Sequence, residues 1–300
     1  MTDHEKRVDD ATGTNLVGHE WDGIEELDTP LPRWWVYLFA ACVVFSAGYV
    51  VAYPAIPDTD GLLGWSSHGQ LDATLKAEMA ARAPRVNAIA ATPIEALESK
   101  PGLMRSAIEG GRAAFKVNCV QCHGSGAAGS QGYPNLNDDD WLWGGDIAAI
   151  QTTILHGIRY PGHDEARFSQ MPAFAEILTK GQIRQLVSYV RLLSGQDQPS
   201  RAATAGAALF AENCASCHGS DGKGNRELGA PNLSDGIWLY GGDRETLAHS
   251  IANARAGAMP HFAGRLDDVT IKMLAAYVHS LGGGETSPAQ PATGASNVGS

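Results

Sequence analysis

The hydrophobic positions of this chain form one long uncharged run near its start. No Asp, Glu, Lys or Arg occurs from Trp34 to Pro57. As a helix, the 20 residues 34–53 would rise about 30 Å, which is the thickness of the hydrocarbon core of a bilayer. Aromatic side chains lie at both ends of the run, as they do at membrane interfaces: Trp34, Trp35 and Tyr37, then Tyr49 and Tyr53. The pattern predicts a transmembrane helix over residues 34–54.

A buried core helix or a cleaved signal peptide would also give an apolar run. The length and the aromatic ends favour a membrane span, and the 33 residues before the run exceed the polar start of a usual signal peptide. Lys6, Arg7 and Arg33 precede the run, whereas the next basic residue is Lys76. By the positive-inside rule, we expect residues 1–33 to form a cytoplasmic tail and everything after the span to lie outside the cytoplasm.

The remaining apolar pattern is helical, and no strand-like alternation of any length appears. Apolar residues recur at i, i+3, i+4 spacing over residues 183–193 and again over 271–278, which predicts two helices, each closing one unit of the chain. Residues 55–104 are predicted to be helix and linker, interrupted by Pro84, Pro93 and Pro101. Residues 284–300 are rich in Gly, Ser, Ala and Pro and are expected to be disordered.

Composition and charge narrow the class of protein. With 18% charged and 44% hydrophobic residues, the chain is neither a disordered nor a coiled-coil protein. The net charge is −11, but residues 1–33 alone hold 9 acidic and 3 basic residues. The excess negative charge therefore lies mainly in the N-terminal tail. The negative net charge of the whole chain argues against a nucleic-acid partner.

Four of the five cysteines belong to two copies of one motif: Cys119-Val120-Gln121-Cys122-His123 and Cys214-Ala215-Ser216-Cys217-His218. C-x-x-C-H is the attachment signature of c-type haem, in which both thiols form thioethers and the histidine binds the iron. Zinc binding or thioredoxin-like redox chemistry is the alternative, and two complete matches with shared flanks count against it. Gly111 and Phe115 recur 95 residues later as Gly206 and Phe210. We predict two haem-binding domains, residues 105–195 and 201–283, carrying two covalently bound haem c groups.

The sixth iron ligands are predicted from the same repeat. Only Met171 and Met259 occupy equivalent positions, each before a proline, whereas the nearby histidines do not align: His156, His163, His249 and His261. We predict His/Met ligation, with Met171 serving the iron of His123 and Met259 that of His218. A methionine that only fills the core, or bis-His ligation in one unit, are the alternatives. In each unit, the first and last helices are expected to cross at the repeated Gly, Phe and Tyr residues.

Each unit resembles class I cytochrome c, and the whole chain resembles the dihaem FixP/CcoP subunit of cbb3-type cytochrome c oxidases. The specific likeness lies in His19-Glu20-Trp21-Asp22-Gly23-Ile24, in Leu31-Pro32-Arg33-Trp34-Trp35 and in His156-Gly157-Ile158-Arg159. It covers residues 19 to about 283 and implies an all-α fold: one N-terminal transmembrane helix followed by two tandem class I cytochrome c domains. It also implies that the carbonyls of Pro134 and Pro231 orient His123 and His218.

The resemblance implies an electron-transfer subunit that is not itself an enzyme. Such a subunit takes electrons from a donor c-type cytochrome and passes them to a monohaem cytochrome c subunit, which feeds the catalytic haem-copper subunit. Its place is the bacterial inner membrane, with periplasmic haem domains. A free-standing membrane-tethered dihaem shuttle and a dihaem peroxidase are the alternatives.

Three further features have open interpretations. Asp138, Asp139 and Asp140 either dock a basic donor or form a solvated loop. Arg159 either faces a haem propionate or is an ordinary surface residue. The first unit carries an insertion around Arg159–Arg167, to which the sequence assigns no role.

Overall fold

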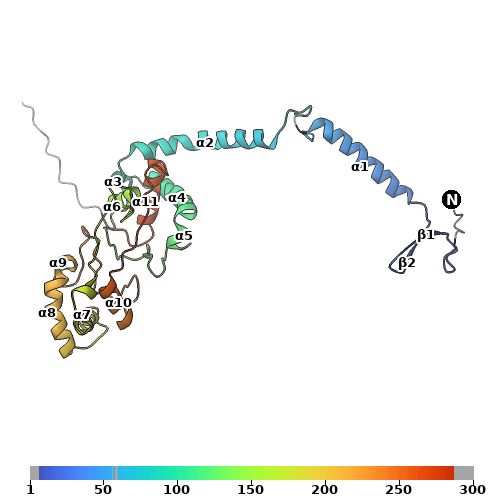
Figure 1. Ribbon diagram of the computed structural model, residues 1–300. Coiled ribbons are helices and arrows are strands. Elements are labelled where there is room, and N and C mark those ends of the chain that lie inside the picture. Colours follow the sequence, from blue (N-terminus) through green and yellow to red (C-terminus); the bar gives the residue numbers. More distant parts are fainter. Residues whose placement is uncertain (1–6, 56, 58–59, 287–300) are drawn as a thin grey trace, which may run out of the picture. The chain divides into compact units, whose positions relative to one another are not determined.

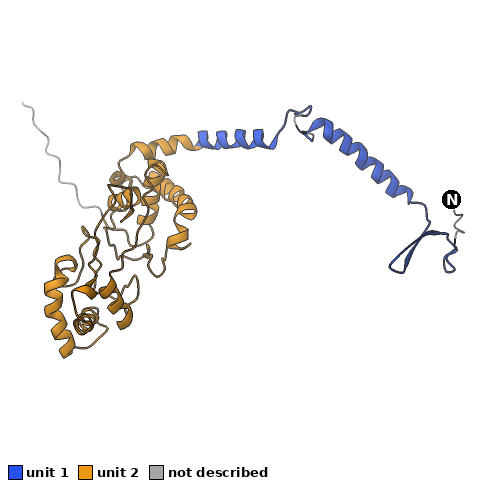
Figure 2. Ribbon diagram, viewed as in Figure 1, with its two compact units in different colours: residues 1–81 blue, residues 82–300 orange. Residues whose placement is uncertain are grey.

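Helices dominate the computed structural model, which describes residues 7–55, 57 and 60–286 (Figure 1). The chain divides into two units, residues 1–81 and 82–300 (Figure 2). The predicted all-α class is confirmed, with one small exception in the first unit. Of the tail predicted over residues 284–300, positions 287–300 lie outside the described residues.

The exception is a two-stranded antiparallel hairpin in the predicted cytoplasmic tail. Strand β1 (Leu16–Trp21) pairs with β2 (Ile24–Leu27), and Trp21 lies opposite Ile24. The two turn residues both have positive φ, 48° at Asp22 and 83° at Gly23, as a type I′ turn requires. The expectation of no strand is wrong here. Neither strand buries a face, so no apolar alternation marks them, and the Asp-Gly turn was the usable signal.

The predicted span is a single helix, α1 (Arg33–Ala52), which has 20 residues. Pro32 precedes its first turn, where a missing backbone N–H costs nothing, and the chain becomes extended at Tyr53. None of its side chains is buried within the protein. By length and composition α1 is a candidate membrane span, within two residues of the predicted limits.

The prolines of the linker behave in two ways. Pro84 lies inside α2 (Ser67–Ala91), so the prediction that it interrupts the helix is wrong. It is exposed, and water can therefore solvate the carbonyl that loses its N–H partner. Pro93 and Pro101 do mark boundaries, because one precedes α3 (Ile94–Leu97) and the other begins α4 (Pro101–Asn118).

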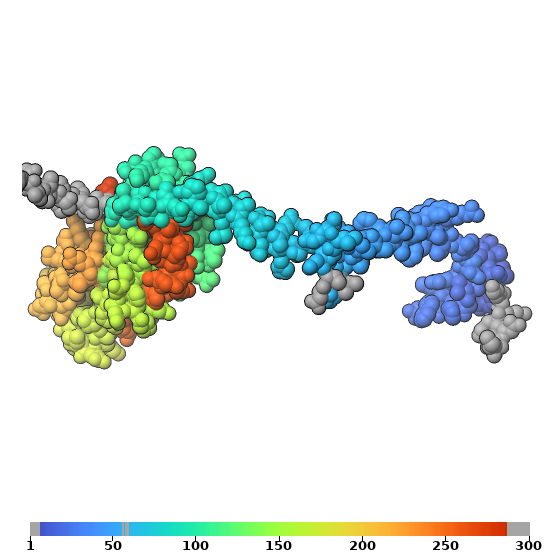
Figure 3. All heavy atoms as spheres, turned by 90° about the horizontal axis from the view of Figure 1, so that it is seen from above, coloured from blue at the N-terminus to red at the C-terminus, as the bar shows by residue number. Residues whose placement is uncertain are grey.

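The second unit has two lobes, and each lobe contains helices from both sequence repeats. The first lobe consists of α3 and α4 with α5 (Val120–His123), α6 (Ile147–His156) and α11 (Asp268–His279). The second lobe consists of η1 (Phe174–Glu176), α7 (Lys180–Leu193), α8 (Arg201–Asn213), α9 (Ala215–His218) and α10 (Arg244–Asn253). The last helix of the second repeat, α11, lies beside α4, the first helix of the first repeat (Figures 1 and 3).

The expectation that the first and last helices of one repeat cross is therefore wrong. The ring of Phe115 on α4 lies 5.3 Å from that of Tyr277 on α11. The ring of Tyr189 on α7 lies 5.2 Å from that of Phe210 on α8. Only residues 194–200 separate α7 from α8, and helices joined by so short a connection pack as neighbours.

Glycine makes each crossing possible. A Cβ on Gly111 would lie 2.0 Å from the carbonyl oxygen of Met273 on α11, and a Cβ on Gly206 would lie 2.1 Å from that of Gln185 on α7. Side chains at these positions would force the helix axes apart. The two crossings are thus equivalent, and each joins a helix of one repeat to a helix of the other.

Each lobe has its own hydrophobic core. In the first lobe the fully buried side chains come from α2, α3, α4, α6 and α11: Ile89, Leu97, Phe115, Ile147, Ile271 and Leu274. In the second lobe they come mainly from α7 and α8: Leu186, Val187 and Phe210. The repeated Gly-Gly-Asp segments begin α6 and α10, because Asp146 and Asp243 accept backbone N–H bonds from the first turns of these helices.

Candidate functional site

Both C-x-x-C-H motifs form the same local structure. In each, the first cysteine ends a helix and the second cysteine and the histidine lie on the next short helix, α5 or α9. The Nδ1 atom of His123 donates to the carbonyl of Pro134 at 3.2 Å, and that of His218 donates to the carbonyl of Pro231 at 3.0 Å. Each Nε2 therefore remains as the lone-pair nitrogen that a metal requires.

The electrostatics of the motifs suit haem attachment. Burial lowers the pKa of His123 and of His218, and the bonds to the proline carbonyls oppose this only in part. Both imidazoles are therefore held in the neutral form that binds iron. Burial, with a smaller contribution from the neighbouring cysteine, raises the pKa of the Cys119 and Cys214 thiols to about 11. A thioredoxin-like motif needs the opposite shift, a lowered thiol pKa.

A cavity of about 670 Å³ lies beside the second motif. Cys214, Cys217, His218 and Pro231 line it, and so does Met171, which belongs to the first repeat. Its other walls are mainly apolar, from Phe174, Leu186, Val190, Trp238, Leu247 and Ile251. The structure therefore brings Met171 to the motif of the other repeat, not to His123 as the sequence suggested.

Met259 shows the reciprocal arrangement. It packs into the core of the first lobe together with Cys119, Val120 and Phe115. Met259 and Ile158 exchange two backbone hydrogen bonds of 2.9 Å, which fix the methionine segment beside the end of α6. Gly157, with φ of 72°, is needed there, because a Cβ would lie 2.5 Å from the Met259 carbonyl oxygen. Both methionines have thus exchanged lobes, following the exchange of helices.

The cavity also contains donors that suit a group with carboxylates. Among the described residues, three buried N–H groups have no hydrogen-bond partner: Trp143 Nε1, Arg167 Nε and Trp238 Nε1. Trp238, Arg159 and Arg255 all line the cavity, and the Arg159 guanidinium also donates to the carbonyls of Gly257 and Ser169. Arg159 is therefore not an ordinary surface residue. Apolar walls, two cations and an unsatisfied indole N–H fit a flat hydrophobic ring with propionates. Sequence reasoning assigned no role to Trp238 or Arg255, although Trp238 recurs at the position of Trp141 in the first repeat.

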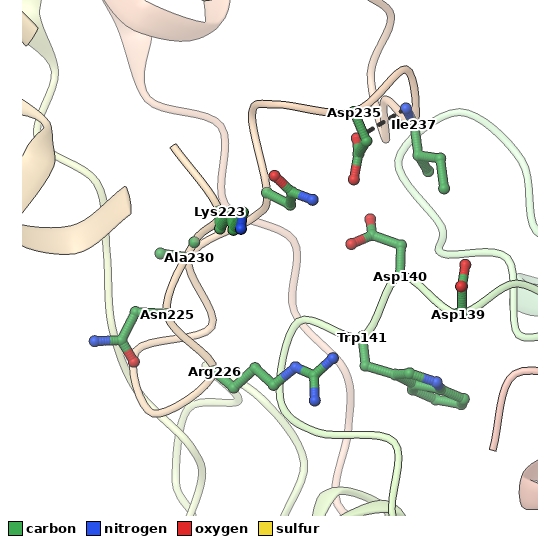
Figure 4. Close-up of a pocket in the computed structure, with 11 residues that line it drawn as sticks. Asp139, Asp140, Trp141, Lys223, Asn225, Arg226, Ala230, Asp235 and Ile237 are labelled. Atoms are coloured by element: carbon green, nitrogen blue, oxygen red, sulfur yellow. Dashed lines mark hydrogen bonds between the residues drawn. The ribbon is translucent and has the colours of Figure 1, made fainter. Parts of the chain in front are cut away.

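The three consecutive aspartates, Asp138, Asp139 and Asp140, lie where the two lobes meet. Figure 4 shows the carboxylates of Asp140 and Asp235 facing one another in a cleft of about 550 Å³ that Arg226 also lines. Burial raises the pKa of Asp140 to about 6, with Asp235, Asp138 and Asp139 adding to this effect and Arg226 opposing it. The ionised form of the Asp140 carboxylate is therefore destabilised at its position between the lobes. The sequence of the loop alone does not predict this position.

Family models match three segments of the chain. Residues 13–60 match the "N-terminal domain of cytochrome oxidase-cbb3, FixP", and residues 201–278 match "Cytochrome C oxidase, cbb3-type, subunit III". Residues 108–194 match "Cytochrome c". Cytochrome c domains imply covalently bound haem c, which is what the geometry of the two motifs suits.

Several relatives are similar over nearly their whole length. A cbb3-type cytochrome c oxidase subunit FixP from Sinorhizobium medicae is 49% identical over 289 residues, 95% of this chain and 100% of the relative. A FixP subunit from Azorhizobium caulinodans is 50% identical over 289 residues, covering 94% and 98%. A CcoP subunit from Cereibacter sphaeroides is 50% identical over 275 residues, covering 90% and 95%. With this coverage added to the two haem motifs and the apolar helix, the chain belongs to the FixP/CcoP family, subunit III of the cbb3-type cytochrome c oxidases.

Proposed function

We propose that this chain is the electron-input subunit of a cbb3-type oxidase. It accepts electrons from a donor c-type cytochrome and relays them through two haem c groups to the monohaem and catalytic subunits of the complex. The observation that carries the proposal is the pair of haem-attachment helices, each with a histidine bonded to a proline carbonyl, His218 buried and His123 partly buried. Haem c, when bound, supplies a one-electron iron couple. Oxygen reduction belongs to the partner subunits.

Each residue of the motifs has one task in this proposal. Cys119 and Cys122 attach one haem, and Cys214 and Cys217 attach the other. The carbonyls of Pro134 and Pro231 orient the two proximal histidines and keep their Nδ1 atoms protonated.

The residues that would hold each haem iron come from different repeats. His123 and Met259 would hold the iron in the first lobe, and His218 and Met171 would hold the iron in the second lobe. Shared surroundings support both pairs, because Met259 and Cys119 pack against the core of the first lobe, whereas Met171 and Cys214 pack against that of the second lobe and line its cavity. With a methionine thioether bound, each haem iron would favour the ferrous state and would offer no site for oxygen or peroxide, which suits a relay and not a peroxidase.

Helix α1 and the basic residues before it determine the proposed location and orientation of the chain in the membrane. With α1 as the span and Lys6, Arg7 and Arg33 before it, residues 1–33 face the cytoplasm and both haem sites face the periplasm. The complex then lies in the inner membrane, and the haem sites meet donors from the periplasmic side.

Purification from native membranes in a mild detergent tests the assignment to the oxidase. We expect b-type haem, copper and oxygen uptake to co-purify with this chain. Cross-linking the membranes before extraction prevents the detergent from removing partner subunits. If the cross-linked sample still shows only a c-type spectrum, the chain is a free-standing membrane-tethered shuttle.

A single-haem background tests the ligand pairs. In Cys119→Ala/Cys122→Ala protein, only the haem of the second motif is attached. There, Met171→Ala should convert the iron to a high-spin state, and Met259→Ala should leave its spectrum unchanged. The reverse result would restore pairing within each repeat.

A further inference from the structure

The insertion of the first repeat forms a closed loop beside the Met259 segment. Its two ends are joined by backbone hydrogen bonds, Arg159 N–H to the Arg167 carbonyl at 2.8 Å and Arg167 N–H to the Gly157 carbonyl at 3.1 Å. Ile158, at the base of this loop, pairs with Met259. The loop has no counterpart in the second repeat, and Arg159 is its one residue that lines the haem cavity described above.

The loop brings three ligand-type side chains together at the end of α6. Nδ1 of His156, the last residue of α6, lies 3.3 Å from Nε2 of His163 and 3.1 Å from Oε2 of Glu165. All three ligand atoms lie within 4.8 Å of one another. A tetrahedral zinc ion with bonds of about 2.0–2.1 Å holds its ligand atoms about 3.3–3.4 Å apart. The two measured separations are close to that value.

His261 supports the position of His163. The two imidazole rings are stacked, with centroids 4.3 Å apart and planes 8° apart. Nδ1 of His261 is bonded to the Ala263 carbonyl at 3.2 Å, which fixes its ring, and the edge of Tyr160 packs against it. A side chain held by stacking loses little further freedom when it binds a ligand. The loop therefore holds His163 ready for coordination.

We propose that His156, His163 and Glu165 bind one divalent transition-metal ion, with Zn²⁺ as the best-fitting probe. Two neutral imidazoles and one carboxylate are a ligand set of borderline metals, and they leave a fourth position for water. Mg²⁺ and Ca²⁺, which require sets of oxygen ligands, do not fit. Because Ile158 pairs with Met259, the bound ion also stiffens the segment that carries this methionine. That last consequence rests on the proposed function, whereas the metal site does not.

Metal titration of the full-length, detergent-solubilised dihaem protein tests the site. After treatment with a chelator, equilibrium dialysis against Zn²⁺ should give one tightly bound ion per chain. Glu165→Gln and His163→Ala should each weaken this binding about tenfold or more. Asp164→Asn is the matched control, since it removes the same charge from the neighbouring exposed residue and should bind as the parent protein does.

X-ray absorption at the zinc edge adds a readout that is independent of haem. We expect imidazole and oxygen neighbours and no sulfur, which excludes cysteine sites such as Cys42. Unaltered binding in both variants, or a sulfur-containing shell, would overturn the site. The side chain of Glu165 is 71% exposed, so Glu165→Gln preserves the fold and keeps the comparison decisive.

The stiffening of the Met259 segment has its own measurement. Bound Zn²⁺ should raise the cyanide concentration that displaces the methionine in the first lobe, without changing that in the second. Binding of Zn²⁺ with no such change would overturn the link to Met259 and leave the metal site supported.

Discussion

The exchange of helices between the repeats can be tested by a double-mutant cycle at the two crossings. Phe115, which is 1% exposed, lies against Tyr277 of the other repeat, with ring centroids 5.3 Å apart and an interplanar angle of 61°. Had the helices crossed within the repeat, its partner would have been Tyr189. Phe115→Leu is therefore combined once with Tyr277→Leu and once with Tyr189→Leu.

The structure fixes the expected magnitudes. Phe115→Leu removes three buried carbon atoms and should cost about 2 kcal/mol of unfolding free energy, at about 0.8 kcal/mol for each buried methylene. An edge-to-face aromatic pair adds about 0.5–1.5 kcal/mol beyond its buried area. That amount should appear as coupling between Phe115 and Tyr277. Residues without shared partners add within about 0.3–0.5 kcal/mol, so Phe115 and Tyr189 should be additive.

Guanidinium unfolding of the full-length ferric protein, followed by far-ultraviolet circular dichroism, gives the four free energies of each cycle. A mirror cycle at the other crossing pairs Phe210 with Tyr189 and, as its control, with Tyr277. The reasoning fails if Phe115 couples to Tyr189 and is additive with Tyr277. That result would mean that each repeat closes upon itself.

Three further predictions concern stability. The pKa of Asp140 is raised from 3.8 to about 6, so the native protein should lose stability as pH rises between these values. The whole shift corresponds to about 3 kcal/mol, which solvent screening of this half-buried group reduces to about 1 kcal/mol. Asp140→Asn should therefore be about 1 kcal/mol more stable than the parent protein in thermal unfolding at about pH 7, and equally stable at about pH 4. Phe210→Ala, at a side chain 1% exposed, should cost about 3–5 kcal/mol in guanidinium unfolding, and a cost below about 1 kcal/mol would contradict the buried crossing. Gly229→Ala would place a Cβ 2.1 Å from the Trp143 ring and should lower the free energy of unfolding by about 1–3 kcal/mol in the same assay. Gly264→Ala is the control, because Gly264 also has positive φ but a Cβ there would meet nothing within 4 Å, so this variant measures the backbone strain alone.

The sequence predicted those features whose physics is local. An uncharged run of bilayer length is sufficient to predict a span, and α1 begins at Arg33, one residue before the predicted start. The two haem-attachment motifs could be recognised from the C-x-x-C-H spacing alone. Pro84 was misjudged because an exposed helix can tolerate a proline that a buried one cannot. The hairpin was missed because its strands bury no face, and only its Asp22-Gly23 turn marked it.

Helix pairing could not be predicted from the repeat itself. Gly111 and Gly206 occupy equivalent positions, so each of the two first helices presents the same surface to either closing helix. Composition at the crossing therefore does not distinguish a partner within the repeat from one outside it. The short connection between α7 and α8 was the available signal, because it favours these two helices as neighbours. Once they pair, α4 and α11 are left for one another.

The exchange also explains where the two repeats differ. In both lobes the methionine segment arrives from the other repeat, but only in the first lobe is a closed loop, residues 159–167, attached to it. Its base pairs with Met259 through two backbone hydrogen bonds, and Gly157 is required for that close approach. In the second lobe, Met171 follows directly into η1 and the core around Phe174. The insertion thus distinguishes two otherwise equivalent methionine segments, because only the Met259 segment is bonded to the closed loop.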